Sequence, residues 1–476
     1  MLKITWLFAM NLIYIIPKYA AYKGLAAGLL VCLLIIGCGN HAIEKTGSQP
    51  NLILISIDTT RKDHCSVYGY ERDTTPNLNA FGEQGARFEQ AYAPTSTTGP
   101  THATIFTSLY PITHHVLKNG LKLSDEYVTL AEILKTQSYQ TAAVISSFVL
   151  NAKFGYAQGF EFYDDAFQPE ESTVKWKYWE GHRVDGSFDR RADHTTNRAI
   201  RWLKKDREQR RPFFMFVHYF DPHAPYTPPD SFLNKLSRKS SLKTQLDKTI
   251  SKYDDEITFT DQQIGKLLKT LKEVGLRSQT LVVITADHGE GLMQHNHMEH
   301  GVNIYDELVR VPLLFSWHNH IPMNRVLNTP VGLIDLAPTI LDLLDIKADS
   351  WSVQGQSLAE ALRGQVQLDP MRPVFLFRRH YNEGTVGHTW VKGKKFGIRV
   401  GKWKYIEGFQ ENTKELFDLE NDPNELINLY DNFPKKSLEL ASKLQEWKQE
   451  NTRANSNRGQ ISKEDSSRLR SLGYVE

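Results

Sequence analysis

Two apolar runs that each end in an aspartate constrain the fold of this chain more than any other feature. Leu52–Ile57 precedes Asp58, and Leu281–Ala286 precedes Asp287. Continuous apolar runs of this length are typical of parallel strands buried on both faces. Because α/β proteins bind ligands at the carboxyl ends of such strands, both aspartates are candidates for a ligand site.

An alternation of strand-like and helix-compatible stretches predicts the α/β class for most of the chain. With 476 residues, of which 40% are hydrophobic and 24% charged, the chain is long enough for a large core and a second, smaller domain. The expected elements of the main domain are, in chain order, Leu52–Ile57, Leu130–Gln137, Thr141–Ile145, Thr195–Arg207, Phe213–His218, Asp254–Val274, Leu281–Ala286 and Leu333–Leu344. The polar segment Asp230–Asp255 is expected to be a surface excursion.

From about Pro373 the chain becomes strand-like again. Val374–Phe377, Gly397–Val400 and Trp403–Ile406 predict a small carboxyl-terminal sheet, which an amphipathic helix around Lys436–Trp447 follows. The predicted organisation is a leader (1–38), a linker (39–49), a catalytic domain (50–350) and a carboxyl-terminal α+β subdomain with a small sheet and terminal helices (351–476).

The first 38 residues differ in character from the rest. An apolar stretch from Ile4 to Pro17 is followed by two lysines and by a second apolar run, Gly24–Gly37. A basic region, a short apolar core and a small residue before the cut describe a secretory signal. Ile35–Cys38 resembles a bacterial lipobox, with Cys38 as the lipidated first residue of the mature protein. This predicts an exported lipoprotein of the bacterial cell envelope, anchored at the periplasmic face of a membrane. An uncleaved membrane helix is the alternative, although the run is shorter than the ~20 residues that span a bilayer.

Charge and cysteine content exclude two classes of protein. The formal net charge of +2 is too close to neutral to suggest a nucleic-acid partner, and acids interrupt the basic run at residues 204–211. Cys65 is the single cysteine after residue 38, so one chain cannot build a disulfide framework. We therefore expect stability to come from the hydrophobic core.

Short motifs spread along the body carry a resemblance to a known family. They are Leu54–Arg61, Tyr68–Tyr70, Thr75–Leu78, Gly85–Phe88, Thr107–Pro111, Asp221–Tyr226, Asp287–Glu290, Arg310–Leu313 and Glu415–Pro423. On these segments the chain resembles the sulfatase family of the alkaline phosphatase superfamily over nearly its whole mature length. The resemblance implies a metal-dependent ester hydrolase. It also implies an α/β fold with a mixed sheet sandwiched by helices and a smaller carboxyl-terminal α+β subdomain.

The nucleophile segment departs from the family pattern. Sulfatases carry Cys-x-Pro-Ser-Arg, whose cysteine or serine becomes formylglycine, whereas the matching positions here are Thr98, Pro100, Thr101 and His102. Oxidation of a threonine would give a ketone rather than an aldehyde, so no formylglycine can form. The formylglycine hydrate releases sulfate by elimination from its second hydroxyl. A sulfated threonine has no second hydroxyl and cannot release sulfate in this way. Water can instead attack a phosphothreonine at phosphorus, which favours phosphate, phosphodiester or phosphonate esters over sulfate esters.

The resemblance makes Thr98 the nucleophile and makes Asp58, Thr98, Asp287 and His288 the metal ligands. An acid-rich set with one imidazole suits Mg²⁺, Mn²⁺, Zn²⁺ or Ca²⁺, so the expected cofactor is a divalent metal, as one ion or two. Such an ion would lower the pKa of the threonine hydroxyl as it does for bound water. Thr59 stands where sulfatases usually have a second aspartate, which disfavours calcium.

Histidine replaces two cations of the family. The family's arginine is His102, and its sulfate-binding lysine aligns approximately with His300. Histidines are metal ligands when neutral, and Asp221 and His223 lie in the loop that brings a sulfate-binding histidine into the family site. One hypothesis is a second metal held by Asp221, His223 and His300, with or without His102. The alternative is that His102, His223 and His300 stabilise the transferred group beside one metal.

Three further polar residues have both structural and functional interpretations. Arg61 serves either the site or a structural ion pair. His218 is interpreted as a buried strand residue. Asn119 is interpreted as a turn residue that could approach the site.

These residues predict a metal-dependent hydrolase of an oxyanion ester. The expected partner is a small-molecule, glycan or lipid ester, with no nucleic acid, and with membrane contact through the amino-terminal lipid anchor. Three alternatives stay open. They are a sulfuric ester hydrolase that works without formylglycine, a transferase of a phospho-group to a glycan or lipid, and a pseudoenzyme that binds anionic glycans.

Overall fold

The computed structural model describes residues 49–236, 243–348 and 351–456. The predicted leader and all but the end of the predicted linker lie outside the described residues, as do residues 457–476. Within the described ranges, no helix is both long enough and apolar enough to cross a membrane. The boundary expected between residues 350 and 351 stays a prediction.

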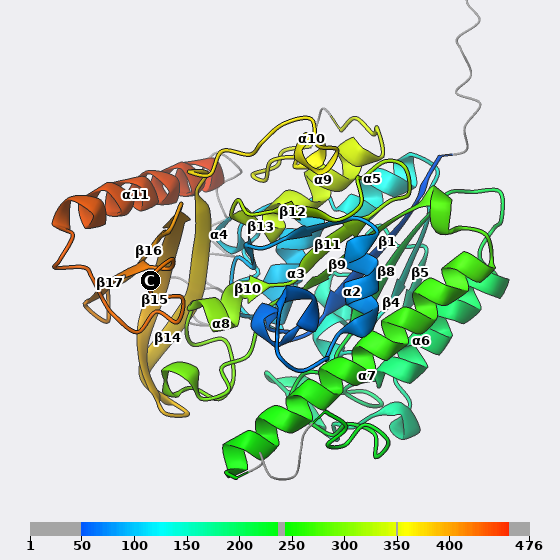
Figure 1. The fold of residues 1–476 in the computed structure, drawn as a ribbon, viewed down its shortest axis with the longest axis horizontal. Coiled ribbons are helices and arrows are strands. Elements are labelled where there is room, and N and C mark those ends of the chain that lie inside the picture. The colour runs from blue at the N-terminus through cyan, green and yellow to red at the C-terminus, as the bar shows by residue number, and fades with distance from the viewer. Residues whose placement is uncertain (1–48, 237–242, 349–350, 457–476) are drawn as a thin grey trace, which may run out of the picture. The chain divides into compact units, whose positions relative to one another are not determined.

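An eight-stranded mixed sheet forms the centre of the main domain (Figure 1). Its spatial order is β12 (Arg325–Leu327), β2 (Ala86–Phe88), β11 (Leu313–Ser316), β9 (Thr280–Ala286), β1 (Asn51–Ile57), β8 (Phe213–Tyr219), β4 (Gln140–Val144) and β5 (Phe162–Asp164). Strands β9, β1, β8, β4 and β5 are parallel, whereas β11 runs antiparallel to β9 and β2. The α/β class and the four expected main-domain strands are thus confirmed.

Helices cover both faces of this sheet, which explains why its central strands are continuously apolar. Leu52 and Leu54 of β1 pack into one hydrophobic cluster, and Ile53 and Ile55 pack into another on the opposite face. The first cluster includes residues of α3 (Thr98–Thr107), α5 (Leu130–Thr136) and α9 (Leu336–Leu343). The second includes residues of α2 (Pro76–Glu83), α6 (Ala192–Arg201) and α7 (Gln245–Glu273), which Figure 1 shows in front of the sheet. The main domain therefore has the expected sandwich of a sheet between helices.

The structure corrects the bounds of three predicted helices. The long helix α7 begins at Gln245 rather than near Asp254, because the Thr244 side chain accepts from the Asp247 N–H in a capping box. The helix expected at Thr195–Arg207 is α6 followed by a π-helical turn, Trp202–Asp206. The helix expected at Leu333–Leu344 begins as a 3₁₀ turn before α9. In each case the presence of a helix was predicted, but the local hydrogen bonding was not.

Short elements connect the main layers. They are the strands β3 (Ala91–Tyr92), β10 (Arg310–Val311) and β13 (Val331–Gly332) of a three-stranded sheet, the hairpin β6 (Tyr178–Trp179) and β7 (His182–Arg183), and the helices α4 (Pro111–His114), α8 (Asp306–Val309) and α10 (Ala359–Leu362).

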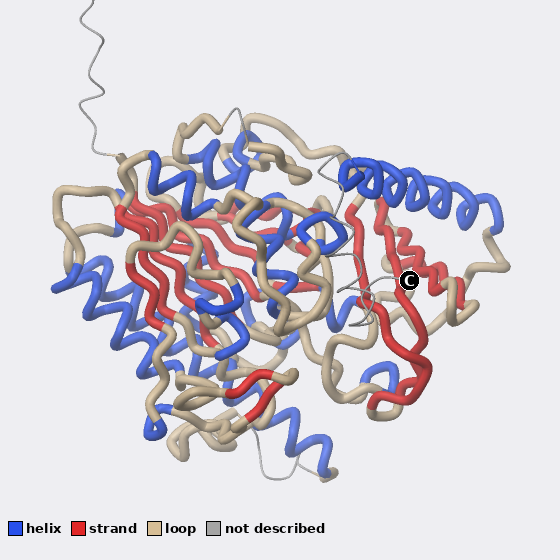
Figure 2. Tube along the Cα trace, turned by 180° about the vertical axis from the view of Figure 1, so that it is seen from behind, coloured by secondary structure: helices blue, strands red, loops and turns tan. Residues whose placement is uncertain are grey.

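The carboxyl-terminal part contains the predicted small sheet, with one more strand than expected. β14 (Val374–Val386), β15 (Thr389–Val400), β16 (Trp403–Gly408) and β17 (Thr413–Asp418) form an antiparallel sheet in sequence order. Residues of α11 (Pro434–Ser456) pack in one hydrophobic cluster with residues of β15, β16 and β17. Figure 2 shows this helix alongside the sheet. The expected carboxyl-terminal α+β subdomain is therefore confirmed.

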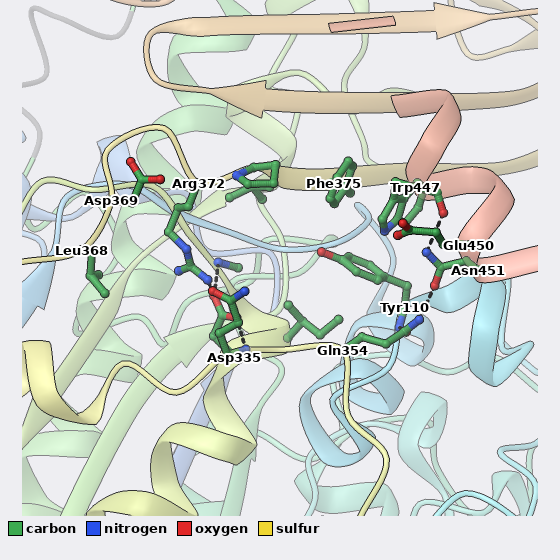
Figure 3. A pocket seen from close by; sticks show the side chains of 15 residues that line it. Tyr110, Asp335, Gln354, Leu368, Asp369, Arg372, Phe375, Trp447, Glu450 and Asn451 are labelled. Carbon is green, nitrogen blue, oxygen red and sulfur yellow. Dashed lines mark hydrogen bonds and ion pairs between the residues drawn. The ribbon is translucent and has the colours of Figure 1, made fainter. Parts of the chain in front are cut away.

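A cavity of about 510 Å³ lies where this subdomain meets the main domain (Figure 3). Tyr110 contributes to its wall from the main domain, and Phe375 and Trp447 contribute from β14 and α11. The Trp447 ring stacks on Phe375 at 4.6 Å between centroids and meets the edge of Tyr110 at 5.0 Å. Trp447 is therefore an aromatic anchor that joins the terminal helix to both parts.

We expect Trp447→Ala to lower the free energy of unfolding by about 3–5 kcal/mol, because it removes a buried aromatic ring and leaves a larger cavity. Urea unfolding followed by circular dichroism measures this difference. Leu438→Ala on the same helix is the matched control, since Leu438 is 69% exposed and its truncation should change stability by less than about 0.5 kcal/mol. Equal losses in the two variants would contradict the anchoring role.

Candidate active site

The two aspartates that follow β1 and β9 emerge side by side. The strands pair in parallel with Ile57 opposite Ala286, so Asp58 and Asp287 leave the sheet at the same edge. Both are fully buried. Neither carboxylate oxygen of Asp58 has a hydrogen-bond partner, and Oδ2 of Asp287 also has none. The other oxygen, Oδ1 of Asp287, accepts from the backbone N–H groups of Thr59 at 3.2 Å and His288 at 2.8 Å.

Burial and mutual repulsion disfavour the charged form of this carboxylate pair. Burial and the Asp287 carboxylate raise the pKa of Asp58 well above its ordinary value, and burial raises the pKa of Asp287. Oγ1 of the neighbouring Thr59 is also buried and unpartnered, and Thr59 has a left-handed backbone with φ of 49°. Several unpartnered oxygens that converge in a buried acidic site fit a divalent cation, whose charge would compensate the carboxylates.

His288 and Thr98 complete the predicted metal-and-nucleophile set. Nδ1 of His288 lies 2.9 Å from the Gly289 carbonyl, to which it donates. The lone pair of Nε2 therefore points toward the site, where Oγ1 of Thr98 lies 3.1 Å away. Ligand atoms of Asp58, Asp287 and His288 lie within 4.8 Å of one another, a spacing that could hold a metal ion. The structure thus brings the four residues together.

The first residue of α3 is Thr98 itself, and a side-chain contact supports this helix start. The Gly99 N–H donates to Oδ1 of Asn119 at 2.7 Å, which ties the loop around residue 119 to the nucleophile segment. Of the two interpretations of Asn119, this contact supports the one in which the residue approaches the site. Arg61 follows its structural interpretation, since it pairs with Asp63 at 2.6 Å and donates to the Glu290 carbonyl at 3.2 Å.

The position of His102 differs from the predicted one. Its Nδ1 lies 2.8 Å from the Thr98 carbonyl, and its Nε2 lies 2.9 Å from Oγ of Ser56. The ring is fully buried beneath the first turn of α3. Because both nitrogens are engaged inside the protein, the structure places His102 as a support for Thr98 rather than against a transferred group.

Two further imidazoles, those of His223 and His300, lie beside His288. The ring centroids of His223 and His300 are 5.0 Å apart, and those of His288 and His300 are 4.4 Å apart. Burial opposes protonation of His300, but Glu290, whose Oε1 lies 3.1 Å from Nδ1, raises its pKa above the ordinary value. Burial and the His300 ring lower the pKa of His223 to about 4. Glu290 therefore favours the protonated form of His300, whereas burial favours the neutral form of His223.

Asp221 is not brought together with these histidines as a ligand group. Its Oδ1 accepts from the Ala192 N–H at 2.8 Å, at the start of α6. Among the described residues, the two groups with metal-ligand spacing are Asp58, Asp287 and His288, and His102, His218 and Asp287. The structure therefore does not assemble the predicted second-metal set of Asp221, His223 and His300, because Asp221 is used to start a helix.

Glu290 ends the Asp287–Glu290 motif, from which the sequence predicted no role for it. The structure shows that it contacts His300. Its carboxylate is fully buried between Nδ1 of His300 and the Tyr226 hydroxyl, which donates to Oε2 at 3.0 Å. The preceding Gly289 has no room for a side chain, because a Cβ there would lie 2.0 Å from the Glu307 carbonyl. In the sequence, the Asp-His-Gly-Glu motif at residues 287–290 is the feature from which a site role for Glu290 could have been predicted.

Comparisons with known proteins agree with this geometry. The family model described as Sulfatase matches residues 50–346, and the model described as N-sulphoglucosamine sulphohydrolase, C-terminal, matches residues 296–453. An N-acetylglucosamine-6-O-sulfatase of Bacteroides thetaiotaomicron is 23% identical over 515 residues, which cover 88% of this chain and 89% of that protein.

Solved structures share the fold. One, determined in complex with its substrate D-glucosamine-2-N,6-O-disulfate, superposes with a TM-score of 0.73 at 21% identity and covers 85% of this chain and 98% of its own. The phosphonate monoester hydrolase of Agrobacterium radiobacter superposes with a TM-score of 0.69 at 21% identity, with 84% and 96% covered. Both the family match, which spans more than half of the chain, and the fold lead to one assignment. The chain belongs to the sulfatase family, a family of ester hydrolases in the alkaline phosphatase superfamily.

Proposed function

We propose that this protein is a metal-dependent hydrolase of an oxyanion ester in which Thr98 is the nucleophile. The observation that carries the proposal is the position of the Thr98 hydroxyl at the start of α3, 3.1 Å from Nε2 of His288 and beside two buried, incompletely partnered carboxylates. Asp58, Asp287 and His288 would hold the ion. When bound there, a divalent ion supplies the positive charge that lowers the pKa of the threonine hydroxyl and stabilises an oxyanion.

The protein side of the reaction follows from the residues around Thr98. Oγ1 of Thr98 forms a bond to phosphorus while the bond from phosphorus to the leaving oxygen breaks, and the hydroxyl proton passes to solvent. Water then attacks the phosphothreonine, and the P–O bond to Thr98 breaks to release the product. Glu290 holds His300 as a hydrogen-bond donor toward the transferred group, and His223 stands next to it. His102 positions Thr98 through its backbone carbonyl.

The substrate is proposed on chemical grounds to be a phosphorus ester. A threonine cannot provide the second hydroxyl by which a formylglycine hydrate eliminates sulfate, whereas a phosphothreonine can be hydrolysed at phosphorus. The phosphonate monoester hydrolase among the structural neighbours is in line with this preference. Sulfate ester hydrolysis is the second candidate, because the named relatives include an N-acetylglucosamine-6-O-sulfatase. Transfer of the phospho-group to a glycan or lipid acceptor is a third outcome of the same covalent step.

We expect Thr98→Val to lower metal-dependent turnover of an aryl phosphonate, phosphodiester or phosphate by about a thousandfold or more, because an isosteric side chain without the hydroxyl cannot form the covalent bond. Steady-state rates on these substrates and on the matching aryl sulfate measure the effect. Thr98→Ser is the matched control, since it keeps a hydroxyl at the same atom and should keep turnover.

Three results would point elsewhere. Turnover of the aryl sulfate alone would replace the phosphorus preference with a sulfatase that works without formylglycine. Release of the aryl group that depends on an added alcohol would indicate a transferase. Unchanged turnover in Thr98→Val would contradict the nucleophile.

We also propose that the protein is exported and attached to the cell envelope by a lipid on Cys38, as the leader pattern predicts. Expression of the full chain in a bacterium with lipoprotein processing should place it in the detergent phase of a Triton X-114 partition. Cys38→Ala should move it to the aqueous phase, because a lipid anchor supplies the apolar surface that drives partition. An identical distribution of the two proteins would contradict the anchor.

A further inference from the structure

His218 has a fully buried imidazole whose two ring nitrogens both lack a hydrogen-bond partner. It is the penultimate residue of β8 and lies opposite Ser56 of β1. Each buried ring nitrogen without a partner destabilises the folded protein, and this imidazole has two of them. A neutral ring in such a place is well suited to bind something through its free lone pair.

His218 faces two carboxylates, Asp58 and Asp287, which also have oxygens that lack hydrogen-bond partners. Nε2 of His218 lies 3.5 Å from Oδ2 of Asp58, an oxygen that also lacks a partner. A ring nitrogen of His218 lies within 4.8 Å of ligand atoms of Asp287 and His102. Unpartnered atoms from three adjacent strand ends, those of β8, β1 and β9, therefore converge on one small volume.

Three separations among these atoms are slightly longer than those of ligands around one ion. Two ligands that each lie about 2.1 Å from a metal are separated by roughly 3.0–3.4 Å at octahedral or tetrahedral angles. The separations are 3.5 Å between His218 and Asp58, 3.5 Å between His288 and Asp287, and 3.8 Å between His288 and Asp58. His218 shares Asp287 with one group of ligand spacing and lies beside Asp58 of the other, so a bound ion would have to draw His218 and His288 toward the two carboxylates.

His102 lies in the same region but is not available as a ligand. Its two nitrogens are engaged by the Thr98 carbonyl and the Ser56 hydroxyl, whereas those of His218 are free. The two rings stand edge to face, 5.2 Å apart. His102 therefore packs against His218 and limits the movement of its ring.

We propose that His218 is a metal ligand, so that Asp58, Asp287, His218 and His288 form a site with two carboxylates and two imidazoles that prefers a transition metal such as Zn²⁺ or Mn²⁺ over Ca²⁺. Two carboxylates and two neutral imidazoles balance the charge of one divalent ion. Imidazole ligands suit zinc and its neighbours, whereas calcium takes oxygen ligands. This inference rests on the metal site of the proposed function and deepens it, because it names a ligand and a class of ion.

X-ray absorption spectroscopy of the zinc-loaded wild-type protein tests the inference without a variant. We expect the extended fine structure to require two imidazoles per zinc. His218→Asn should reduce this number to one and weaken zinc binding by about tenfold or more, since even residues that only orient a ligand contribute 10–100-fold. His218→Asn should also narrow the preference for Zn²⁺ over Ca²⁺ measured by calorimetry, because an amide oxygen replaces a ring nitrogen.

His114→Asn is the matched control. His114 is a buried histidine of the same domain, but its Nε2 lies 3.1 Å from Oγ1 of Thr104 and its Nδ1 accepts from the Val116 N–H. Its replacement should leave the imidazole count and the ion preference unchanged, even if stability falls. Thermal unfolding of both apoproteins shows whether each variant is folded before the ion is added.

The outcomes separate this inference from the proposed function. Two imidazoles in the wild type and one in His218→Asn support His218 as a ligand. One imidazole in the wild type, with tight zinc binding, overturns the inference and leaves the metal site of Asp58, Asp287 and His288 in place. Absence of stoichiometric binding by Zn²⁺, Mn²⁺, Mg²⁺ and Ca²⁺ overturns both.

Discussion

The repulsion between two buried carboxylates is the constraint around which the active site is built. The parallel register of β1 and β9 places Asp58 and Asp287 at the same sheet edge, where both are fully buried. Burial of an unpaired carboxylate raises the free energy of its charged form, and a second carboxylate close by raises it further. A divalent ion relieves this repulsion directly, and His288 and Thr98 bring an imidazole nitrogen and a hydroxyl to the pair.

The scaffold encloses this site in packed side chains. Because helices cover both faces of the sheet, the strand ends open into a region already enclosed by packed side chains. The first turn of α3 brings the Thr98 hydroxyl to within 3.1 Å of Nε2 of His288, and His102 beneath it ties that turn to Ser56 of β1. On the other side, Tyr226 and Glu290 fix His300. A preorganised set of this kind stabilises developing charge without reorganisation during the reaction.

The fold could be predicted from the sequence where the information is local. Apolar runs of strand length located β1, β4, β8 and β9, and the acids after two of them located the carboxylate pair. The start of α7 was missed although Thr244 and Asp247 have the spacing of a capping box, because the polar composition around them suggested a loop.

The site residues that were misplaced depend on partners far away in the sequence. Asp221 accepts from Ala192, 29 residues earlier, so its place at a helix start could not be read from its own loop. His102 contacts Ser56, 46 residues away. His218 was correctly interpreted as a buried strand residue, but periodicity alone does not show that both ring nitrogens lack partners and that Asp58 is 3.5 Å away. Tertiary hydrogen bonding, not residue type, separates the supporting histidine from the candidate ligand.

The most direct test of the central claim is to trap the covalent intermediate on Thr98. The metal-loaded protein would be mixed with excess aryl phosphate or aryl phosphonate, denatured with acid during turnover, digested, and analysed by mass spectrometry of the peptide that contains residue 98. We expect a stoichiometric phosphoryl or phosphonyl group on Thr98 that disappears in Thr98→Val. Turnover with an unmodified Thr98, or with the group on another residue, would contradict it.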